Sequence, residues 1–175
     1  MSLAGRMYAA SHLTGTFTLR SGRVATEYFD KYRFESDPAL LSEIAELAAG
    51  QIPEGTQGLA GLELGGVPFA TVLSLKTGLP LFLVRKEAKK YGTERICEGG
   101  DVSGLNLLVV EDVVTTGGQI VLSTDDLRAA GAVITNALCV IDRESGGPDL
   151  VAQSDVTLRS LFTMTELQQA GAASD

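Results

Sequence analysis

Hydrophobic positions in the first fifty residues follow the spacing of helices and of one extended pair. The apolar residues of 38–49 recur at helical spacing, and Asp37 before Pro38 is typical of a helix start. This pattern predicts a helix over 38–49. We also expect a helix near the N-terminus, followed by a short extended pair within 15–32.

From residue 58 onward, short apolar runs alternate with segments that suit a helix. The predicted strands cover 58–64, 79–86, 107–112, 132–143 and 156–162, and the predicted helices cover 67–78, 119–131 and 163–171. Strands that alternate with helices favour a parallel sheet covered on both faces, which is an α/β fold. Residues 87–104 are polar, rich in glycine and without periodicity, and a loop of that length is usually functional or mobile.

The charge balance argues against large polyanionic partners. The 175 residues include 14 Lys and Arg and 22 Asp and Glu, a net charge of −8, which repels nucleic acid and anionic membranes. A basic site must therefore be local. No stretch reaches the roughly 18 apolar residues of a membrane span, and the N-terminus lacks a signal peptide's apolar segment. We expect a single-domain cytoplasmic protein, with Cys97 and Cys139 as free thiols.

Residues 107–120, LLVVEDVVTTGGQI, combine features that suit a phosphorylated sugar. Glu111 and Asp112 follow an apolar strand, and ligands of open α/β sheets gather at the carboxyl ends of strands. Residues 115–119 open the next predicted helix, where unpaired N–H groups and the helix dipole attract a phosphate. Two carboxylates repel a phosphate and instead face ribose hydroxyls or hydrated Mg²⁺. A ribose 5-phosphate fits both halves.

Other phosphate motifs do not match this stretch. A P-loop needs a lysine and a Ser or Thr after its glycines, but Gly118 is followed by Gln119. The dinucleotide fingerprint needs three spaced glycines, and here two are adjacent. The remaining alternative is that the carboxylates are solvated charges at a strand end and that the glycines form an ordinary turn.

The stretch VVEDVVTTGG resembles the phosphoribosyl pyrophosphate (PRPP) motif of the type I phosphoribosyltransferases. Other segments resemble the orotate phosphoribosyltransferases in particular: GTFTLRSGRVATEYFD, GLELGGVP, VRKEAKKYGT with EGG beyond it, and VIDRESGG. The resemblance covers roughly residues 13–165. It implies one domain over 1–175 with a central parallel sheet flanked by helices, small N-terminal hood elements at about 1–36, a core at about 37–165 and a flexible catalytic loop at about 87–104.

The resemblance also implies roles for individual residues. Lys89, Glu111 and Asp112 are the expected catalytic residues: Lys89 is a mobile cation and the carboxylates hold the ribose hydroxyls. The residues expected to bind PRPP are Arg85, Lys86, Lys89, Glu111, Asp112, Val113, Val114, Thr115, Thr116, Gly117, Gly118, Gln119, Glu63, Leu64, Gly65 and Gly66. The residues expected to bind orotate are Thr115, Arg143, Arg20, Tyr28 and Phe29.

The implied reaction transfers ribose 5-phosphate from PRPP to orotate and gives orotidine 5′-monophosphate and pyrophosphate in de novo pyrimidine biosynthesis. Mg²⁺ is the implied cofactor, carried mainly by the pyrophosphate with no direct protein ligand. The resemblance implies a homodimer in which the loop bearing Lys89 closes over the neighbouring subunit's site. A PRPP-sensing regulatory protein and a phosphoribosyltransferase for a purine base are the alternatives.

Some positions depart from the pattern of many family members. Tyr91 stands where histidine is common after the loop lysine, and Arg20 replaces lysine. Leu64 and Gly65 replace a Tyr-Lys pair, which removes one pyrophosphate contact. His12, the only histidine, lies in the first predicted helix away from every motif, and we expect it to be structural or on the surface.

Overall fold

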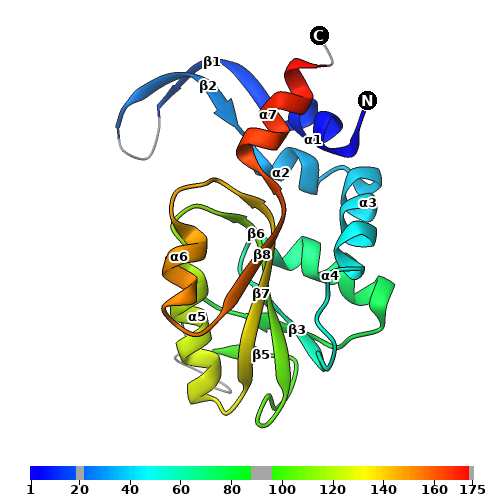
Figure 1. The fold of residues 1–175 in the computed structure, drawn as a ribbon, viewed down its shortest axis with the longest axis vertical. Coiled ribbons are helices and arrows are strands. Elements are labelled where there is room, and N and C mark those ends of the chain that lie inside the picture. The colour runs from blue at the N-terminus through cyan, green and yellow to red at the C-terminus, as the bar shows by residue number, and fades with distance from the viewer. Residues whose placement is uncertain (19–21, 88–95, 174–175) are drawn as a thin grey trace.

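The computed structural model describes residues 1–18, 22–87 and 96–173, which contain a six-stranded sheet with helices on both faces (Figure 1). The strands are β3 (Gly58–Leu62), β4 (Leu81–Val84), β5 (Cys97–Glu98), β6 (Asn106–Val114), β7 (Val133–Asp142) and β8 (Thr157–Thr163). Their spatial order is β5-β4-β3-β6-β7-β8. Neighbouring strands are parallel except at the edge, where β5 is antiparallel to β4. The predicted α/β class with a central, mostly parallel sheet is confirmed.

Helices pack on both faces of the sheet. α3 (Pro38–Ala49) and α4 (Gly66–Thr77) lie on one side, and α5 (Gly118–Ala129) and α6 (Gly147–Ala152) lie on the other (Figure 1). α3 has the predicted bounds, because the Asp37 carboxylate accepts the free N–H groups of its first turn. α4 and α5 both begin at the carboxyl edge of the sheet, on either side of β6.

A second layer of structure lies beyond that edge. It contains α1 (Leu3–Ser11), the antiparallel pair β1 (His12–Thr18) and β2 (Val24–Phe29), α2 (Lys31–Glu35), and α7 (Met164–Ala172) from the other end of the chain. Figure 1 shows the β1-β2 hairpin projecting from the body, with α7 beside α1. These elements cover the carboxyl ends of the sheet strands, where the predicted site residues lie.

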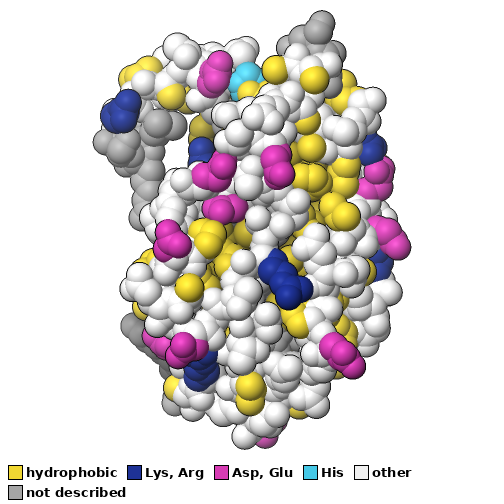
Figure 2. Space-filling view, in the orientation of Figure 1, with side chains coloured by type: hydrophobic (Ala, Val, Ile, Leu, Met, Phe, Trp, Pro, Cys, Tyr) yellow, Lys and Arg dark blue, Asp and Glu magenta, His cyan; other side chains and the backbone are white. Residues whose placement is uncertain are grey.

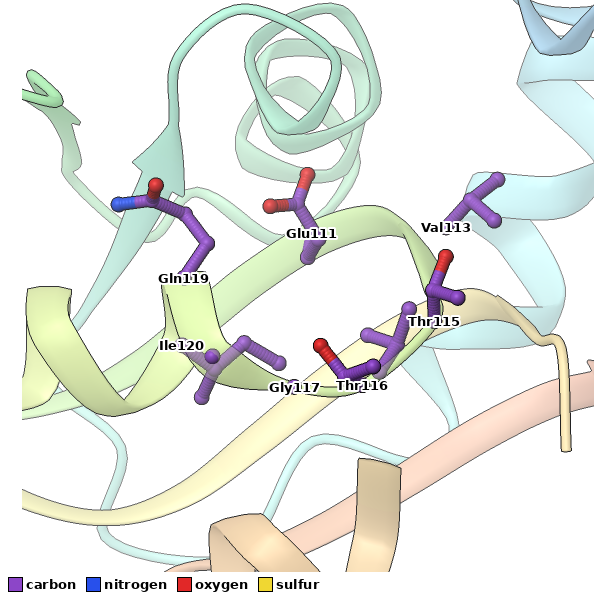
Figure 3. Close-up of a pocket in the computed structure, with 9 residues that line it drawn as sticks. Glu111, Val113, Thr115, Thr116, Gly117, Gln119 and Ile120 are labelled. Atoms are coloured by element: carbon purple, nitrogen blue, oxygen red, sulfur yellow. The ribbon is translucent and has the colours of Figure 1, made fainter. Parts of the chain in front are cut away.

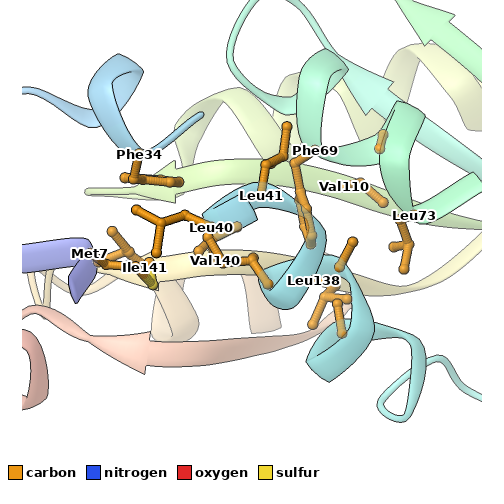
Figure 4. Packing of buried hydrophobic residues seen from close by; sticks show 14 of the residues in the cluster. Met7, Phe34, Leu40, Leu41, Phe69, Leu73, Val110, Leu138, Val140 and Ile141 are labelled. Carbon is orange, nitrogen blue, oxygen red and sulfur yellow. The ribbon is translucent and has the colours of Figure 1, made fainter. Parts of the chain in front are cut away.

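The core joins this second layer to the sheet. One cluster of buried side chains combines Met7 of α1 and Phe34 of α2 with Phe69 of α4 and with Leu138 and Ile141 of β7 (Figure 4). Each of these side chains is no more than 1% exposed. Burial on this scale contributes roughly 1.5–3 kcal/mol per large apolar side chain. The N-terminal helices are therefore anchored firmly over the carboxyl edge of β6 and β7.

Three short elements were not predicted from the sequence: α2, β5 and α6. β5 is two residues long, falls within the predicted loop 87–104, and is held by pairing with β4. α2 and α6 have five and six residues, too few for a periodic pattern to predict. Tertiary contacts rather than local sequence define these elements.

The remaining sequence predictions concern the surface and the thiols. On the face shown in Figure 2, acidic side chains are spread over the surface with basic ones between them. Cys97 and Cys139 are both buried free thiols, as predicted. In the part of the chain that the structure describes, no helix combines the length and the apolar character needed to span a bilayer.

Candidate active site

The carboxyl half of β6 carries the two predicted carboxyl groups inside the strand rather than beyond it. β6 continues to Val114 because Val113 and Val114 still pair with β7. The prediction that the strand ends at residue 112 is therefore wrong. Side chains alternate between the faces of a strand, so Asp112 is fully buried whereas Glu111 lines a pocket on the opposite face.

The loop after β6, where the sequence predicts a site for an anion, lines a pocket. A pocket of about 190 Å³ is lined by Glu111 and by all residues from Val113 to Ile120. Figure 3 shows the polar ends of Glu111, Thr115 and Gln119 extending to the same side of this loop. No side chain caps α5, so its first N–H groups can bind an anion in that pocket.

Close packing fixes the shape of this loop. Gly117 has a φ of 81°, a left-handed conformation that glycine adopts without strain. A Cβ atom on Gly117 would lie 2.9 Å from the Gly147 oxygen and 2.8 Å from a Val151 methyl group, both of α6. α6 therefore packs directly against the loop and leaves no room for a side chain at position 117.

The predicted pyrophosphate turn, residues 63–66, lies beside Asp112. The Glu63–Leu64 peptide bond is cis, and α4 begins immediately after the turn with no side-chain cap. A Cβ atom on Gly65 would lie only 2.1 Å from Oδ2 of Asp112. The backbone of the turn thus packs directly against this carboxyl group, and a side chain at position 65 has no space.

The basic pair at the end of β4 is tied to the same turn. The Lys86 backbone N–H donates to Oε1 of Glu63 at 2.7 Å, and the Glu63 N–H donates to the Val84 oxygen at 2.9 Å. Arg85 forms an ion pair with Glu98 of β5, with Nε 3.3 Å from Oε1. The structure therefore brings Arg85, Lys86 and the turn together.

A second pocket lies between the hairpin and the helices that cover the sheet edge. It measures about 170 Å³ and includes three of the predicted orotate-binding residues, Tyr28, Phe29 and Arg143. Thr115 instead lines the pocket at the start of α5. His12 also lines the second pocket, its ring stacked on Tyr8 with centroids 4.7 Å apart. The prediction that His12 lies away from every motif is therefore wrong.

The loop that carries Arg143 is held at both ends. The Arg143 N–H donates to the Val114 oxygen at 2.8 Å. The next residue, Glu144, accepts from the backbone N–H and the hydroxyl of Thr165 at 2.9 and 2.6 Å. Because Thr165 lies in α7, the position of Arg143 is set by β6 on one side and by the C-terminal helix on the other.

α2 adds two titratable side chains, Lys31 and Glu35, that the sequence analysis missed. Lys31 forms an ion pair with Asp112, with Nζ 2.5 Å from Oδ2. Glu35, one helical turn later, is 7% exposed and also faces Asp112. In the sequence, Lys31 and Glu35 stand four residues apart after Asp30, whose side chain accepts the Tyr32 N–H and caps α2. This spacing places two side chains on one face only within a helix, and α2 was not predicted.

The four groups around β6 shift one another's pKa values. Burial and, to a smaller extent, the neighbouring Asp112 carboxylate together raise the pKa of Glu35 to about 9. Burial also raises the pKa of Glu111. For Asp112 the effect of burial is outweighed by the neighbouring Glu35, Glu111 and Lys31 side chains, so its pKa is lowered. At neutral pH the cluster therefore favours an ionised Asp112 beside a protonated Glu35 and the Lys31 ammonium group.

Glu35 should make the protein less stable as the pH rises. Its pKa is about 9 in the folded state against an ordinary 4.5, so between these values the folded chain keeps a proton that the unfolded chain has lost. The contribution of this proton to the free energy of unfolding is fully present below pH 4.5. It falls by up to about 1.4 kcal/mol per pH unit between pH 4.5 and pH 9. Glu35→Gln should therefore raise the melting temperature at pH 8.5 by at least about 3 °C.

The measurement is a thermal unfolding series from pH 5 to pH 9. Glu54→Gln is the matched control, because Glu54 is exposed on the surface. We expect a shallower decline for Glu35→Gln and the wild-type decline for the control. An equal decline in both variants would mean that Glu35 is already ionised in the folded protein.

Two of the predicted site residues, Lys89 and Arg20, lie outside the residues that the structure describes, as does Tyr91. The other predicted residues fall into three adjacent groups: the loop after β6, the turn 63–66 with the basic pair, and the pocket under the hairpin. The loop after β6 can hold an anion. The turn 63–66 with the basic pair, beside the carboxyl groups of β6, can hold a second anion next to a diol. The pocket under the hairpin can hold a flat polar ring.

Comparisons with known proteins show the family to which the chain belongs. The model of the phosphoribosyl transferase domain family matches residues 33–160. The chain is therefore a member of the phosphoribosyltransferases, transferases whose fold is an α/β sheet of this kind.

Individual relatives narrow the family further. An orotate phosphoribosyltransferase of Nocardioides sp. is 50% identical over 169 residues, which cover 97% of this chain and 94% of the relative. One from Methanocella arvoryzae is 46% identical over 153 residues, 87% of each chain. The crystal structure of Mycobacterium tuberculosis orotate phosphoribosyltransferase with PRPP superposes with a TM-score of 0.81 at 27% identity and covers 95% of this chain and 96% of that one. The chain belongs to the orotate phosphoribosyltransferases, the pentosyltransferases of pyrimidine biosynthesis.

Proposed function

We propose that PRPP binds along the carboxyl ends of β3, β4 and β6, with each part of the molecule held by a different segment. The 5-phosphate would occupy the pocket at the start of α5, and the ribose hydroxyls would face Glu111 and Asp112. The pyrophosphate would lie on the turn 63–66 with Arg85 and Lys86. The observation that carries this proposal is the contact of Gly65 with Asp112, which places the turn directly against β6, the strand that leads into the loop.

Orotate would occupy the pocket that contains Tyr28, Phe29 and Arg143. Its planar ring suits the aromatic side chains, and its carboxylate suits a guanidinium group that can donate two parallel hydrogen bonds. Arg20, which follows β1, and Thr115 would complete this site. His12 adds an imidazole to the same pocket and would be a further donor to an anionic base.

The reaction separates charge, and the site would stabilise both signs. As the bond between the anomeric carbon and pyrophosphate breaks, the carbon becomes cationic and the leaving group gains negative charge. The Asp112 carboxylate would lie near the cationic carbon, while Arg85, Lys86 and Lys89 would face the pyrophosphate. The ring nitrogen of orotate loses its proton readily, so Asp112 would position the ribose rather than act as a strong base.

Mg²⁺ fits this scheme as a cation carried by PRPP. It binds oxygen ligands, keeps several waters and is often held through substrate phosphates, and a pyrophosphate on the turn 63–66 would offer such oxygens. Bound there, it would neutralise charge on the leaving group. The side chains beside the turn, Arg85 and Lys86, would bind the remaining oxygens of the same anion.

The proposed function also implies a domain organisation and a dimer. The chain would form one domain, with hood elements at about 1–36, a core at about 37–165 and a catalytic loop at about 87–104. In a homodimer, the loop bearing Lys89 would close over the neighbouring subunit's site and exclude water from the reaction. Buried reduced Cys97 and Cys139 are in keeping with a cytoplasmic enzyme.

The decisive experiment measures the loss of orotate absorbance after addition of purified protein, PRPP and Mg²⁺. Adenine, hypoxanthine and uracil serve as parallel acceptors. Turnover with orotate alone would support both the PRPP site and the base pocket. Turnover with another base would overturn the assignment of Arg143 and the hairpin, and PRPP binding without turnover would favour a regulatory protein.

Arg143→Ala should raise the KM for orotate at least about tenfold, because it removes a charged hydrogen bond worth roughly 1.5–3 kcal/mol. The KM for PRPP should change less, since Arg143 lies in the other pocket. Initial rates with each substrate varied in turn would measure both constants. Arg159→Ala on β8 is the control, and a larger effect of Arg143→Ala on PRPP than on orotate would contradict the assignment.

A further inference from the structure

Lys31 reaches the centre of the site from outside the PRPP motif. It is the first residue of α2, whose next turn inserts the fully buried Phe34 into the main core cluster (Figure 4). Lys31 and Glu35 are four residues apart and therefore lie on one face of the helix. Because Phe34 anchors α2, both side chains are held toward the buried carboxyl group of Asp112.

The ion pair joins two groups of different exposure. The Lys31 side chain is 32% exposed, the Asp112 side chain is 0% exposed, and Nζ lies 2.5 Å from Oδ2. The other carboxyl oxygen, Oδ1, accepts the Val113 N–H at 2.7 Å. Within the described residues, Lys31 is the only basic side chain that forms an ion pair with Asp112. The ammonium group and the strand backbone together fix the plane of the carboxylate.

The other groups that face Asp112 add no positive charge. Glu35 comes from the same helix as Lys31, and Glu111 comes from β6 itself. Burial raises the pKa of both carboxyl groups, which favours their neutral form. A buried carboxylate without a cation nearby tends to take up a proton. Lys31 is therefore the described group that favours the ionised form of Asp112 through charge.

The turn 63–66 cannot replace this charge. A Cβ atom at Gly65 would lie 2.1 Å from Oδ2 of Asp112, so the turn has no room for a basic side chain at that position. Lys31 brings its ammonium group to that same oxygen from α2. Asp112 is thus contacted by the backbone of the turn at Gly65 and by the Lys31 side chain of α2.

We propose that Lys31 is a positioning residue for the transfer reaction, which keeps Asp112 ionised and correctly oriented for the ribose hydroxyls of PRPP. The inference rests on the proposed role of Asp112 and extends it to α2. It also gives the N-terminal segment a role in binding PRPP, in addition to its proposed role in binding the base.

The first test compares Lys31→Met with the wild type between pH 4 and pH 8. We expect the dissociation constant for PRPP at pH 7 to rise at least about tenfold, because the carboxylate loses the ammonium group that orients it. The acid limb of kcat/KM for PRPP should move to higher pH by about one unit or more, and Lys31→Arg should keep the wild-type limb. Lys76→Met, which breaks an ion pair with the more exposed Glu46, is the control for loss of a lysine. A wild-type acid limb and PRPP affinity in folded Lys31→Met would overturn the proposal.

The second test is a double-mutant cycle with Asp112→Asn. If Lys31 acts through Asp112, then Lys31→Met should change PRPP affinity less than about twofold once the carboxylate is absent. Persistence of the full effect would mean that Lys31 acts on PRPP directly or only on the fold, and would also overturn the proposal. Failure of the proposed function looks different, because Asp112→Asn would then leave PRPP binding unchanged.

Discussion

Asp112→Asn should lower kcat/KM for PRPP by at least about a hundredfold, a loss of roughly 2.7 kcal/mol of transition-state stabilisation. The amide keeps the shape of the side chain and can still accept the Val113 N–H. It removes the negative charge that would hold the ribose hydroxyls and face the cationic carbon. It also leaves the Lys31 ammonium group beside a neutral side chain in a partly buried site.

Initial rates with varied PRPP, together with a direct measurement of PRPP binding, would test this prediction. Asp125→Asn is the matched control, because Asp125 is an exposed aspartate on α5. The control should retain wild-type kinetics. If Asp112→Asn did the same while remaining folded, the carboxylate would have no part in binding PRPP, and the proposed site would need another diol-binding group.

The position of Asp112 was predictable from the sequence, whereas its surroundings were not. The order of apolar strand, paired carboxyl groups, threonines and glycines placed the phosphate loop at the start of a helix, and the structure has α5 beginning at Gly118. Lys31 and Glu35 lie far from Asp112 along the chain. Nothing local in the sequence indicates that α2 turns them toward β6, because that orientation depends on the burial of Phe34 in the core.

The elements of the fold that were predicted are those that local sequence determines, whereas the missed ones depend on tertiary contacts. The helix 38–49 was predicted to the residue because Asp37, Pro38 and the apolar spacing all act locally. The buried strands β3, β6 and β7 were predicted because continuous apolar runs are typical of parallel sheets. β5, by contrast, has two residues and exists through its pairing with β4. His12 was misplaced for a related reason, since its pocket is assembled from α1, the hairpin and α7.

The contact between the turn and the strand leads to the second large effect. Gly65→Ala should reduce kcat/KM for PRPP by at least about a hundredfold, because displacing site groups by around 1 Å can cost that much. The added Cβ would lie 2.1 Å from Oδ2 and 2.4 Å from Cγ of Asp112, so the turn or the carboxylate must move. Gly65 has φ −64° and ψ −38°, which alanine adopts easily. The effect is therefore one of space alone.

Gly50→Ala provides the matched control for this substitution. Gly50 ends α3 with φ −71°, and a Cβ there would approach no atom closer than 3.7 Å, so the control should keep wild-type activity. Both variants would be compared by PRPP titration and by thermal unfolding, where overpacking at position 65 should cost roughly 1–3 kcal/mol. Wild-type PRPP affinity in Gly65→Ala would show that the turn and Asp112 move independently. Gly65→Lys should impair the enzyme as well, because its Cβ would meet the same carboxylate with which Lys31 already forms an ion pair.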